Sequence, residues 1–287
     1  MSKWQWGWEG VLGVIAVLGL GMVLVTAPTA HLFNVLAQAA PLGLVAVGLA
    51  LSLRTGMPNL AVGAVSALSG VLVATAVDVA ELSLIAGVLL VLVLAAFAGL
   101  VTGAFTVLVA APAWAVTLGA AVACEALMLT VTGGRMIALG DLPAYSPVLW
   151  FAVFAVVSVA GGLLWARRDV RGRLSKGWTA GLVGLAGSSV LAALGGFVLL
   201  LRQGAAQPGS QGMSITVFAL AAVLLGGTSP NGERGAVTGT LLSVLILAIA
   251  QVQLVVLNIP AWVYTLVLGA VIMVGLTVSR LLESLRP

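Results

Sequence analysis

The sequence contains very little charge. Of its 287 residues, 12 are Lys or Arg and 8 are Asp or Glu, so 7% are charged, whereas 62% are hydrophobic. Soluble domains carry about 25% charged residues, so this chain has too few to cover a surface that faces water. Intrinsic disorder needs high charge and low hydrophobicity, and it is excluded as well. With a mean hydropathy of +1.24, the composition is that of a polytopic membrane protein.

Patterns that carry chemistry are also missing. No phosphate-binding loop of the form G-x-x-x-x-G-K-[ST] occurs, so we expect the chain not to hydrolyse ATP by itself. The one cysteine, Cys124, excludes an intrachain disulfide. No His, Cys, Asp and Glu residues have the spacing of a metal site, and no nucleophile–base arrangement is present. We therefore expect no catalytic residues, no metal and no cofactor. Because the basic residues lie at the ends of apolar segments, we also expect no nucleic-acid partner.

The sequence consists instead of long apolar runs. A helix that spans a bilayer takes about 20 mostly apolar residues, and continuous runs favour helices over a membrane barrel. The expected segments are residues 11–27, 33–53, 59–77, 83–109, 113–131, 147–165, 177–201, 214–227, 235–257 and 262–281. The fourth is long enough to tilt or break, and the eighth is too short to span. We predict an all-α polytopic membrane bundle of about ten helices, with residues 1–287 forming a single transmembrane domain.

The basic residues orient these segments. Lys and Arg accumulate in the cytoplasmic loops of membrane proteins. If the N-terminus is inside, only Arg135 and Arg202 fall outside, and ten basic residues lie on the cytoplasmic side. We therefore expect both termini in the cytoplasm, with Trp4, Trp6 and Trp8 as an interfacial aromatic anchor. The ten cytoplasmic residues are Lys3, Arg54, Arg167, Arg168, Arg171, Arg173, Lys176, Arg234, Arg280 and Arg286.

Three stretches carry a resemblance to a known family. They are residues 54–70 (RTGMPNLAVGAVSALSG), 114–134 (WAVTLGAAVACEALMLTVTGG) and 205–240 (AAQPGSQGMSITVFALAAVLLGGTSPNGERGAVTGT). In order and spacing they resemble the permease subunits of ribose-type bacterial ABC importers, whose signatures read like GIDLSVG, TLGTxxxxRGLxxxxTGG and LGGTSxxGGxGxxxGT. That superfamily also contains branched-chain amino-acid and nucleoside permeases. The resemblance implies a type II importer membrane domain in the bacterial inner membrane. It also implies a second permease subunit, ABC ATPase subunits and an extracytoplasmic substrate-binding protein as partners.

The chain departs from this family at its coupling segment. Between the sixth and seventh helices, family members carry a cytoplasmic stretch resembling GRYIYAxGGNxxAAxxSGI, which docks on the ATPase. Here residues 166–176 read ARRDVRGRLSK, which is shorter and lacks the GGNxxAA pattern. Glu125 replaces the arginine of the second signature, and Asn59 stands where sugar-type members have Asp. These departures favour one half of a heterodimeric permease whose partner supplies the standard coupling segment.

Glu125 is the acid that lies well inside an expected span, about twelve residues into the fifth segment. A carboxylate at that depth costs a few kcal/mol unless it is paired, protonated or faces water. Two interpretations remain open. Glu125 either lines the substrate pathway or pairs with an arginine of a partner subunit, or it is a neutral, hydrogen-bonded carboxyl packed between helices.

Four further polar residues are candidates for the substrate pathway. Asn34 and Gln38 are four apart and share one helix face, where they contact the solute near the outer mouth or bond to a neighbouring helix. Asn59 either bonds a polar solute or caps a tight cytoplasmic turn. Thr117 begins the fifth segment, where close helix packing is the alternative role.

Small and basic residues complete the pattern. The pairs Gly99–Gly103 and Gly235–Gly239 have the spacing that lets helices pack closely. The densest run of charge either docks on an ATPase or contacts anionic lipid heads, which contributes roughly 1 kcal/mol per residue. This run consists of Arg167, Arg168, Arg171, Arg173 and Lys176.

Taken together, these patterns favour a permease subunit of an ATP-driven importer for a small polar solute, a sugar before other classes, and not an enzyme. Two alternatives stay open: a non-transporting or regulatory pseudo-permease, and a nucleoside or amino-acid permease of the same superfamily. A secondary carrier would need inverted repeats and paired intramembrane charges, which the sequence does not display.

Overall fold

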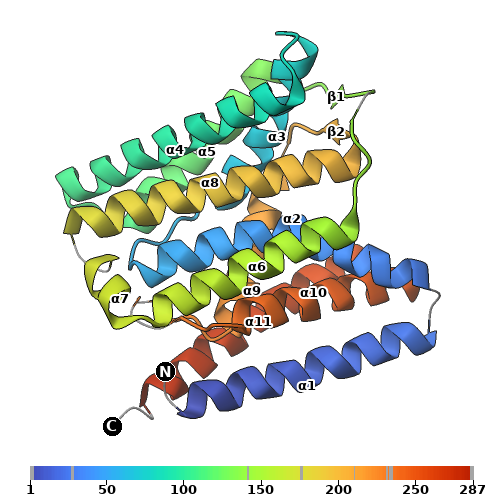
Figure 1. The fold of residues 1–287 in the computed structure, drawn as a ribbon, viewed down its shortest axis with the longest axis vertical. Coiled ribbons are helices and arrows are strands. Elements are labelled where there is room, and N and C mark those ends of the chain that lie inside the picture. Colours follow the sequence, from blue (N-terminus) through green and yellow to red (C-terminus); the bar gives the residue numbers. More distant parts are fainter. Residues whose placement is uncertain are drawn as a thin grey trace.

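The computed structural model describes residues 3–26, 29–140, 142–174, 177–209, 211–230, 232 and 235–284. This part of the chain contains eleven helices and one two-stranded sheet, arranged as a bundle (Figure 1). The helices are α1 (Lys3–Thr26), α2 (Thr29–Arg54), α3 (Val62–Asp78), α4 (Leu84–Val109), α5 (Ala113–Thr132), α6 (Pro147–Ala166), α7 (Arg168–Leu174), α8 (Gly177–Gln203), α9 (Gln211–Leu225), α10 (Gly239–Val256) and α11 (Ala261–Ser284). The strands are β1 (Ile137–Ala138) and β2 (Ala205–Ala206).

The predicted fold class, a polytopic helix bundle, is confirmed. Among the described residues, eight helices are long and apolar enough to cross a membrane, whereas α3 and α9 are shorter, with 17 and 15 residues. The short eighth segment of the prediction corresponds to α9. The fourth segment, expected to tilt or break, is one unbroken helix, α4. The first helix begins at Lys3 and not at residue 11, so it includes polar residues that the apolar pattern left outside.

Helix α2 lies at the centre of the bundle (Figure 1). From residue 39 to residue 51 it is apolar around its whole circumference, so this part has no polar face to turn outward and is surrounded by other helices. Leu44 and Leu49 are completely buried, and α8, α6, α10 and α9 pack around them. Glycines bring α8 close: a Cβ atom on Gly48 would lie 2.8 Å from the carbonyl oxygen of Ser188.

A proline inside α2 frees one backbone carbonyl. Pro41 has no N–H to donate to the carbonyl oxygen of Ala37, four residues earlier. Tyr145, from the segment between α5 and α6, donates its hydroxyl to that oxygen at 3.1 Å. Burial raises the pKa of Tyr145 to about 12, against a smaller opposing effect of the Arg202 charge, so the hydroxyl keeps its proton at neutral pH. The freed carbonyl therefore has a partner where water is scarce.

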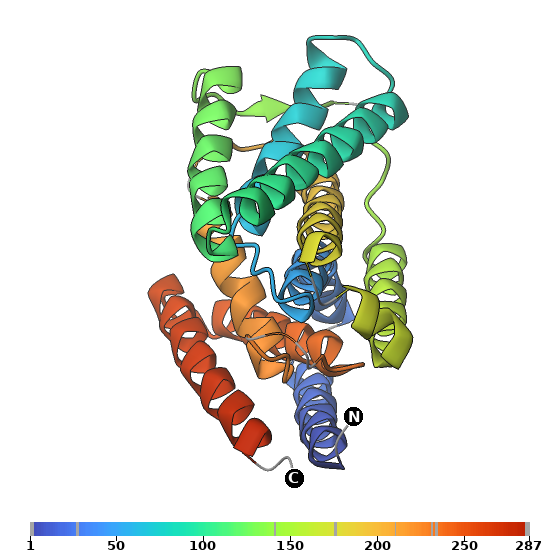
Figure 2. The ribbon, with the colours of Figure 1, turned by 90° about the vertical axis from the view of Figure 1, so that its left-hand side faces the viewer.

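The two ends of the bundle differ in structure. At one end, α6 continues into the short helix α7. At the other end, β1 and β2 pair antiparallel with Ile137 opposite Ala206. The sequence did not predict this small sheet. Figure 2 shows α5 (green) and α11 (red) on one side of the molecule, above and below α9. Both helices expose most of their surface, which is apolar.

Candidate functional site

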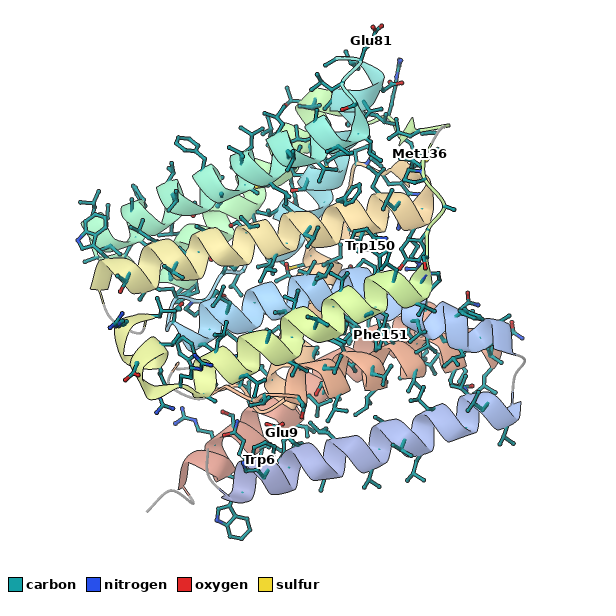
Figure 3. All side chains as sticks on the ribbon, viewed as in Figure 1. Trp6, Glu9, Glu81, Met136, Trp150 and Phe151 are labelled. Atoms are coloured by element: carbon teal, nitrogen blue, oxygen red, sulfur yellow. The ribbon has the colours of Figure 1, made fainter. Side chains whose placement is uncertain are left out.

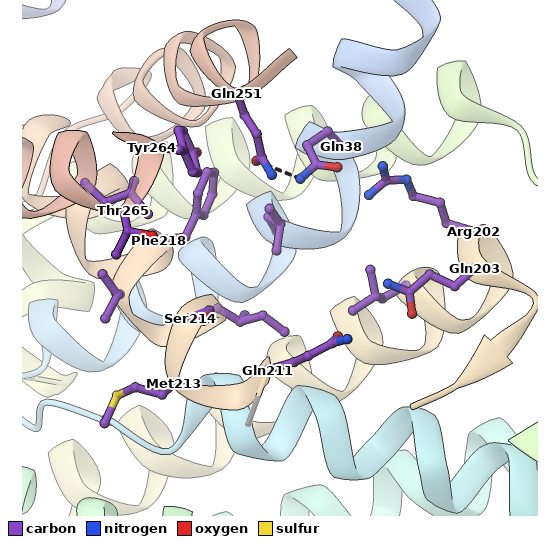
Figure 4. Close-up of a pocket in the computed structure, with 15 residues that line it drawn as sticks. Gln38, Arg202, Gln203, Gln211, Met213, Ser214, Phe218, Gln251, Tyr264 and Thr265 are labelled. Atoms are coloured by element: carbon purple, nitrogen blue, oxygen red, sulfur yellow. Dashed lines mark hydrogen bonds between the residues drawn. The ribbon is translucent and has the colours of Figure 1, made fainter. Parts of the chain in front are cut away.

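A cavity of about 420 Å³ lies where five helices meet. It is located near the end of the bundle that carries the sheet, because it includes the last residues of α8 and the first residue of α9 (Figure 4). It is lined by Gln38 and Leu42 of α2, Leu199, Arg202 and Gln203 of α8, Gln211, Met213, Ser214, Ile215, Val217 and Phe218 of α9, Gln251 of α10, and Tyr264, Thr265 and Leu268 of α11.

The cavity has an apolar floor and a polar rim. Leu42, Phe218 and Leu268 are buried, and they form part of the floor. The described lining contains four glutamines, which lie on α2, α8, α9 and α10. The side chains of Gln38 and Gln251 bond to each other, with Gln38 Nε2 donating to Gln251 Oε1 at 2.7 Å (Figure 4). This bond joins α2 to α10 across the cavity.

The chemistry of the rim suits a neutral, hydrogen-bonding molecule. A glutamine amide both donates and accepts hydrogen bonds, so it can pair with a hydroxyl in either direction. Arg202 is the one residue of the described lining that is charged at neutral pH, and its exposed side chain adds positive charge at the rim. The rings of Phe218 and Tyr264 provide apolar surface beside these polar groups.

Of the five residues predicted for the substrate pathway, Gln38 lines the cavity. Asn34, one helical turn earlier on α2, is exposed and is not among the lining residues. Glu125 is half-buried on α5 and is likewise absent from the lining. The structure therefore does not bring these three side chains together in one site.

Asn59 and Thr117 lie together around the turn between α2 and α3. Asn59 is buried; its Nδ2 donates to Ser188 Oγ at 2.7 Å, and its Oδ1 accepts from the N–H of Ala61 at 3.0 Å. Thr117 Oγ1 accepts from the N–H of Leu60 at 3.0 Å. Both side chains thus bond to backbone groups of the turn, and Asn59 also bonds to Ser188 of α8. For Asn59 this is the turn-capping alternative that the sequence left open.

The predicted ATPase contact lies in and beside α7. Arg167, Arg171 and Arg173 are at the end of the bundle opposite the cavity. Arg168 begins α7, but its side chain lies outside the described residues, as does the whole of Lys176. The predicted run of charge is therefore located on a helix of seven residues between α6 and α8.

Sequence reasoning missed a second cluster, at the start of α1. Glu9 is 4% exposed, so it is a more deeply buried acid than Glu125. It was overlooked because the expected first segment began at residue 11. The spacing of Gln5, Trp8 and Glu9 is the available signal, since residues three and four apart share one helix face. Trp8, predicted as part of an interfacial anchor, donates its indole N–H to the carbonyl oxygen of Leu225 at 2.8 Å.

Comparison with known proteins places this architecture in a family. Residues 31–167 and 178–276 match the family described as the branched-chain amino acid transport system / permease component. The chain belongs to this permease family. The resemblance predicted from the three signatures is thereby confirmed. Two described elements fall outside the matched ranges, namely α1 and α7.

Curated relatives of this permease include permease proteins of two import systems. The ribose import permease protein RbsC of Escherichia coli (strain K12) is 28% identical over 276 residues, which cover 87% of this chain and 85% of that protein. The autoinducer 2 import system permease protein LsrC of Yersinia pseudotuberculosis serotype IB (strain PB1/+) is 29% identical over 254 residues, covering 80% of this chain and 71% of that protein. No solved structure matches the chain.

Proposed function

We propose that this permease is the membrane subunit of an ATP-driven importer that passes a sugar across the bacterial inner membrane. The observation that carries the proposal is the likeness to a ribose import permease along 87% of the chain. A second relative is an import permease for autoinducer 2. The chain itself would carry out no catalysis, and separate ABC ATPase subunits would hydrolyse ATP.

The cavity supports a sugar over a charged amino acid. Gln38, Gln203, Gln211 and Gln251 offer neutral amides that match hydroxyl groups, and Phe218 offers an apolar face. The described lining includes no carboxylate to pair with an ammonium group. We infer that Gln38 contacts the solute directly and that Asn34 contacts it near the outer mouth.

The remaining pathway residues take supporting roles in this proposal. Asn59 and Thr117 hold the turn between α2 and α3, and they shape the pathway through it. Glu125 is half-buried on α5, whose apolar surface is mostly exposed. We propose that a second permease subunit covers this surface and supplies a partner for the Glu125 carboxyl, because an uncompensated carboxylate in hydrocarbon is costly.

We propose docking sites for the other partners at the two ends of the bundle. Arg167, Arg171 and Arg173 would contact an ATPase subunit, with anionic lipid heads as neighbouring partners. The extracytoplasmic substrate-binding protein would dock at the opposite end, where the cavity lies. The assembly would then contain two permease subunits, of which this chain is one half.

One observation favours a second candidate, a regulatory subunit that does not transport. The family match omits residues 168–177, the region of α7. A subunit that lacks the usual coupling segment would contact its ATPase weakly and depend on a partner permease. The shared fold would remain in either case.

A transport assay tests the proposed function. The complex is isolated from its native membrane through this chain, reconstituted in vesicles, and assayed for ribose uptake with and without ATP. We expect ATP-dependent uptake that is lost when this chain is omitted. The variant Gln251→Ala removes a cavity amide and should lower uptake at limiting ribose by about five- to tenfold, since a hydrogen bond contributes about 1 kcal/mol.

Gln253→Ala is the matched control for Gln251→Ala. It changes the same residue type on the same helix, at a position that does not line the cavity. Equal loss of uptake in both variants would argue against the cavity as the solute site. Undiminished uptake without this chain would favour the regulatory subunit, and uptake that needs no ATP would favour a carrier.

A further inference from the structure

The start of α1 forms hydrogen bonds with the segment that joins α9 to α10. The buried Glu9 carboxylate accepts two backbone N–H bonds from this segment, from Val237 at 3.1 Å and from Thr238 at 3.0 Å. The Thr238 hydroxyl also donates to it. At the other end of the segment, Trp8 bonds to the carbonyl oxygen of Leu225. One turn of α1 therefore holds both ends of the connection.

A buried arginine of α2 also bonds to this segment. Arg54 is 3% exposed, and its Nη2 donates to the carbonyl oxygen of Ala236 at 2.7 Å. Gln5 is 2% exposed and donates to the carbonyl oxygen of Gly235 at 2.9 Å. With the two bonds of Glu9, side chains hold backbone groups of four successive residues, and Glu9 and Arg54 attract each other. We call Gln5, Trp8 and Glu9 the α1 clamp.

The clamp is not explained by membrane anchoring. The side chains of Trp4 and Trp6 are 58% and 56% exposed and suffice as an interfacial anchor. A helix that only anchors the chain needs no buried carboxylate, which is expensive to desolvate. The clamp also lies outside the residues that match the permease family, which begin at residue 31. Its residues are therefore additional to those that the family match covers.

The clamped segment contacts α6 at the α7 end of the bundle and joins two helices that line the cavity. Near the end of α6, a Cβ atom on Gly162 would lie 2.6 Å from the Cα atom of Val237, so α6 and the segment are in direct contact just before α7. The segment continues into α9 and α10, which both line the cavity. Glu9 lies beside it at the end of the bundle that carries α7 (Figure 3). A displacement of α7 would therefore reach the cavity helices through this segment.

We propose that the α1 clamp positions the α9–α10 segment so that movement at α7 is transmitted to the cavity, with Glu9 as its principal positioning residue. This role rests on the proposed transport function. The clamp acts on the rate of the conformational cycle and not on solute binding. Loosening it should lower the maximal uptake rate and leave the half-saturating solute concentration unchanged.

Two substitutions of Glu9 and one control test the clamp. Glu9→Gln keeps the shape of the side chain but has one acceptor oxygen, so one backbone N–H loses its partner. Glu9→Ala removes both acceptors. Glu81→Gln is the matched control, because Glu81 is an exposed acid at the opposite end of the bundle (Figure 3). The first measurement is hydrogen–deuterium exchange of the purified chain in detergent, which does not depend on transport.

We expect exchange in the peptide that covers residues 235–240 to rise about tenfold in Glu9→Ala and by less in Glu9→Gln, because a lost hydrogen bond of about 1.4 kcal/mol is a factor of ten. In both Glu9 variants, exchange in α2 should equal that of the wild type. In Glu81→Gln, exchange in residues 235–240 should also equal that of the wild type. The second measurement is ribose uptake by the reconstituted complex. Its maximal rate should fall severalfold in Glu9→Gln at unchanged half-saturating ribose.

Each other result overturns the proposal. Unchanged exchange in both Glu9 variants would show that no clamp acts on the segment. Faster exchange throughout all helices in both variants would assign Glu9 to global stability. Faster local exchange with an unchanged maximal rate would remove the clamp from transport. If the wild-type complex shows no uptake at all, the proposed function fails, and the coupling role fails with it, while the exchange experiment still decides whether the clamp exists.

Discussion

Several polar side chains inside this bundle bond to backbone groups that the helices leave free. Around the turn between α2 and α3, Thr216 Oγ1 accepts from the N–H of Gly63 at 3.1 Å, and Thr117 and Asn59 bond to neighbouring groups. Lipid offers no hydrogen bonds, so an irregular segment at membrane depth needs such partners from the protein itself. Asn59, Thr117 and Thr216 supply such partners around this turn.

Tyr145 provides a test of this role at a single residue. The variant Tyr145→Phe leaves the Ala37 carbonyl without a partner, because Pro41 cannot supply an N–H. We expect a loss of about 1–3 kcal/mol in the free energy of unfolding, measured by denaturant titration in detergent. Since the pKa of Tyr145 is raised to about 12, the bond should be fully present below pH 10 and be lost as the pH rises through 12.

Tyr264→Phe is the control for that measurement. Tyr264 donates to the carbonyl oxygen of Leu247 at 3.2 Å, but Leu247 lies inside α10, where the helix already provides an N–H partner. Its loss should therefore be clearly smaller than that of Tyr145→Phe. A larger loss in Tyr264→Phe would mean that the proline-freed carbonyl has no special need of the Tyr145 hydroxyl.

Single-residue roles were only partly predictable from sequence. Asn59 and Thr117 were recognised as polar residues in unusual places, but nothing in the sequence says whether such a side chain faces a solute or a neighbouring backbone. Glu9 was missed because hydropathy places the start of a helix where the polar residues end. In the structure α1 begins earlier, at Lys3, and Glu9 bonds to a segment more than 200 residues away in the sequence. Such long-range contacts leave no local pattern.

At the scale of elements, glycine pairs set the distance between helices. Helix α4 packs along α8, and Gly99 and Gly103 lie in that contact. A Cβ atom on Gly99 would lie 2.6 Å from the Cα atom of Ala186. The predicted packing role of the Gly99–Gly103 pair is thus confirmed. The second predicted pair differs, because Gly235 lies before α10 and is not part of a helix.

The α4–α8 contact predicts a pair of stability changes. Gly103→Ala places a methyl group 2.6 Å from the carbonyl oxygen of Gly181, so the two helices must separate, and we expect a loss of about 1–3 kcal/mol in the free energy of unfolding. Gly119→Ala, in the exposed helix α5, meets no atom within 4 Å and should be neutral or gain up to about 1 kcal/mol. Thermal unfolding in detergent measures both. An equal loss in the two variants would mean that glycine acts through helix propensity and not through the contact.

Helices were the most predictable elements. Apolar runs of about 20 residues give their existence and approximate bounds because lipid permits few other backbone structures. The sheet of β1 and β2 was not predicted, since two residues per strand carry no periodicity. The cavity was not predicted either. Its lining comes from five helices, and the sequence gives no information on which helix ends converge.

At the scale of the whole molecule, charge separates the two ends of the bundle. Arg54, Arg167, Arg171, Arg173 and Arg280 lie at or near the end that carries α7, where the described acids are Glu9 and Asp169. The opposite end holds a mixture of signs, namely Asp78, Glu81, Arg135 and Arg202. Because Lys and Arg are retained on the cytoplasmic side of membranes, we propose that the α7 end is cytoplasmic and that the cavity end faces the opposite side.

Labelling of single cysteines in vesicles tests this orientation. Cys124 is the only cysteine, so Cys124→Ser gives a background without thiols. In that background, Glu81→Cys and Arg173→Cys place one thiol at an exposed position near each end. With a membrane-impermeant maleimide, we expect Glu81→Cys to react in right-side-out vesicles and Arg173→Cys only in inverted ones. The reverse pattern would place the cavity in the cytoplasm. A substrate-binding protein outside the cell could not reach it there, and an importer would be excluded in favour of export or regulation.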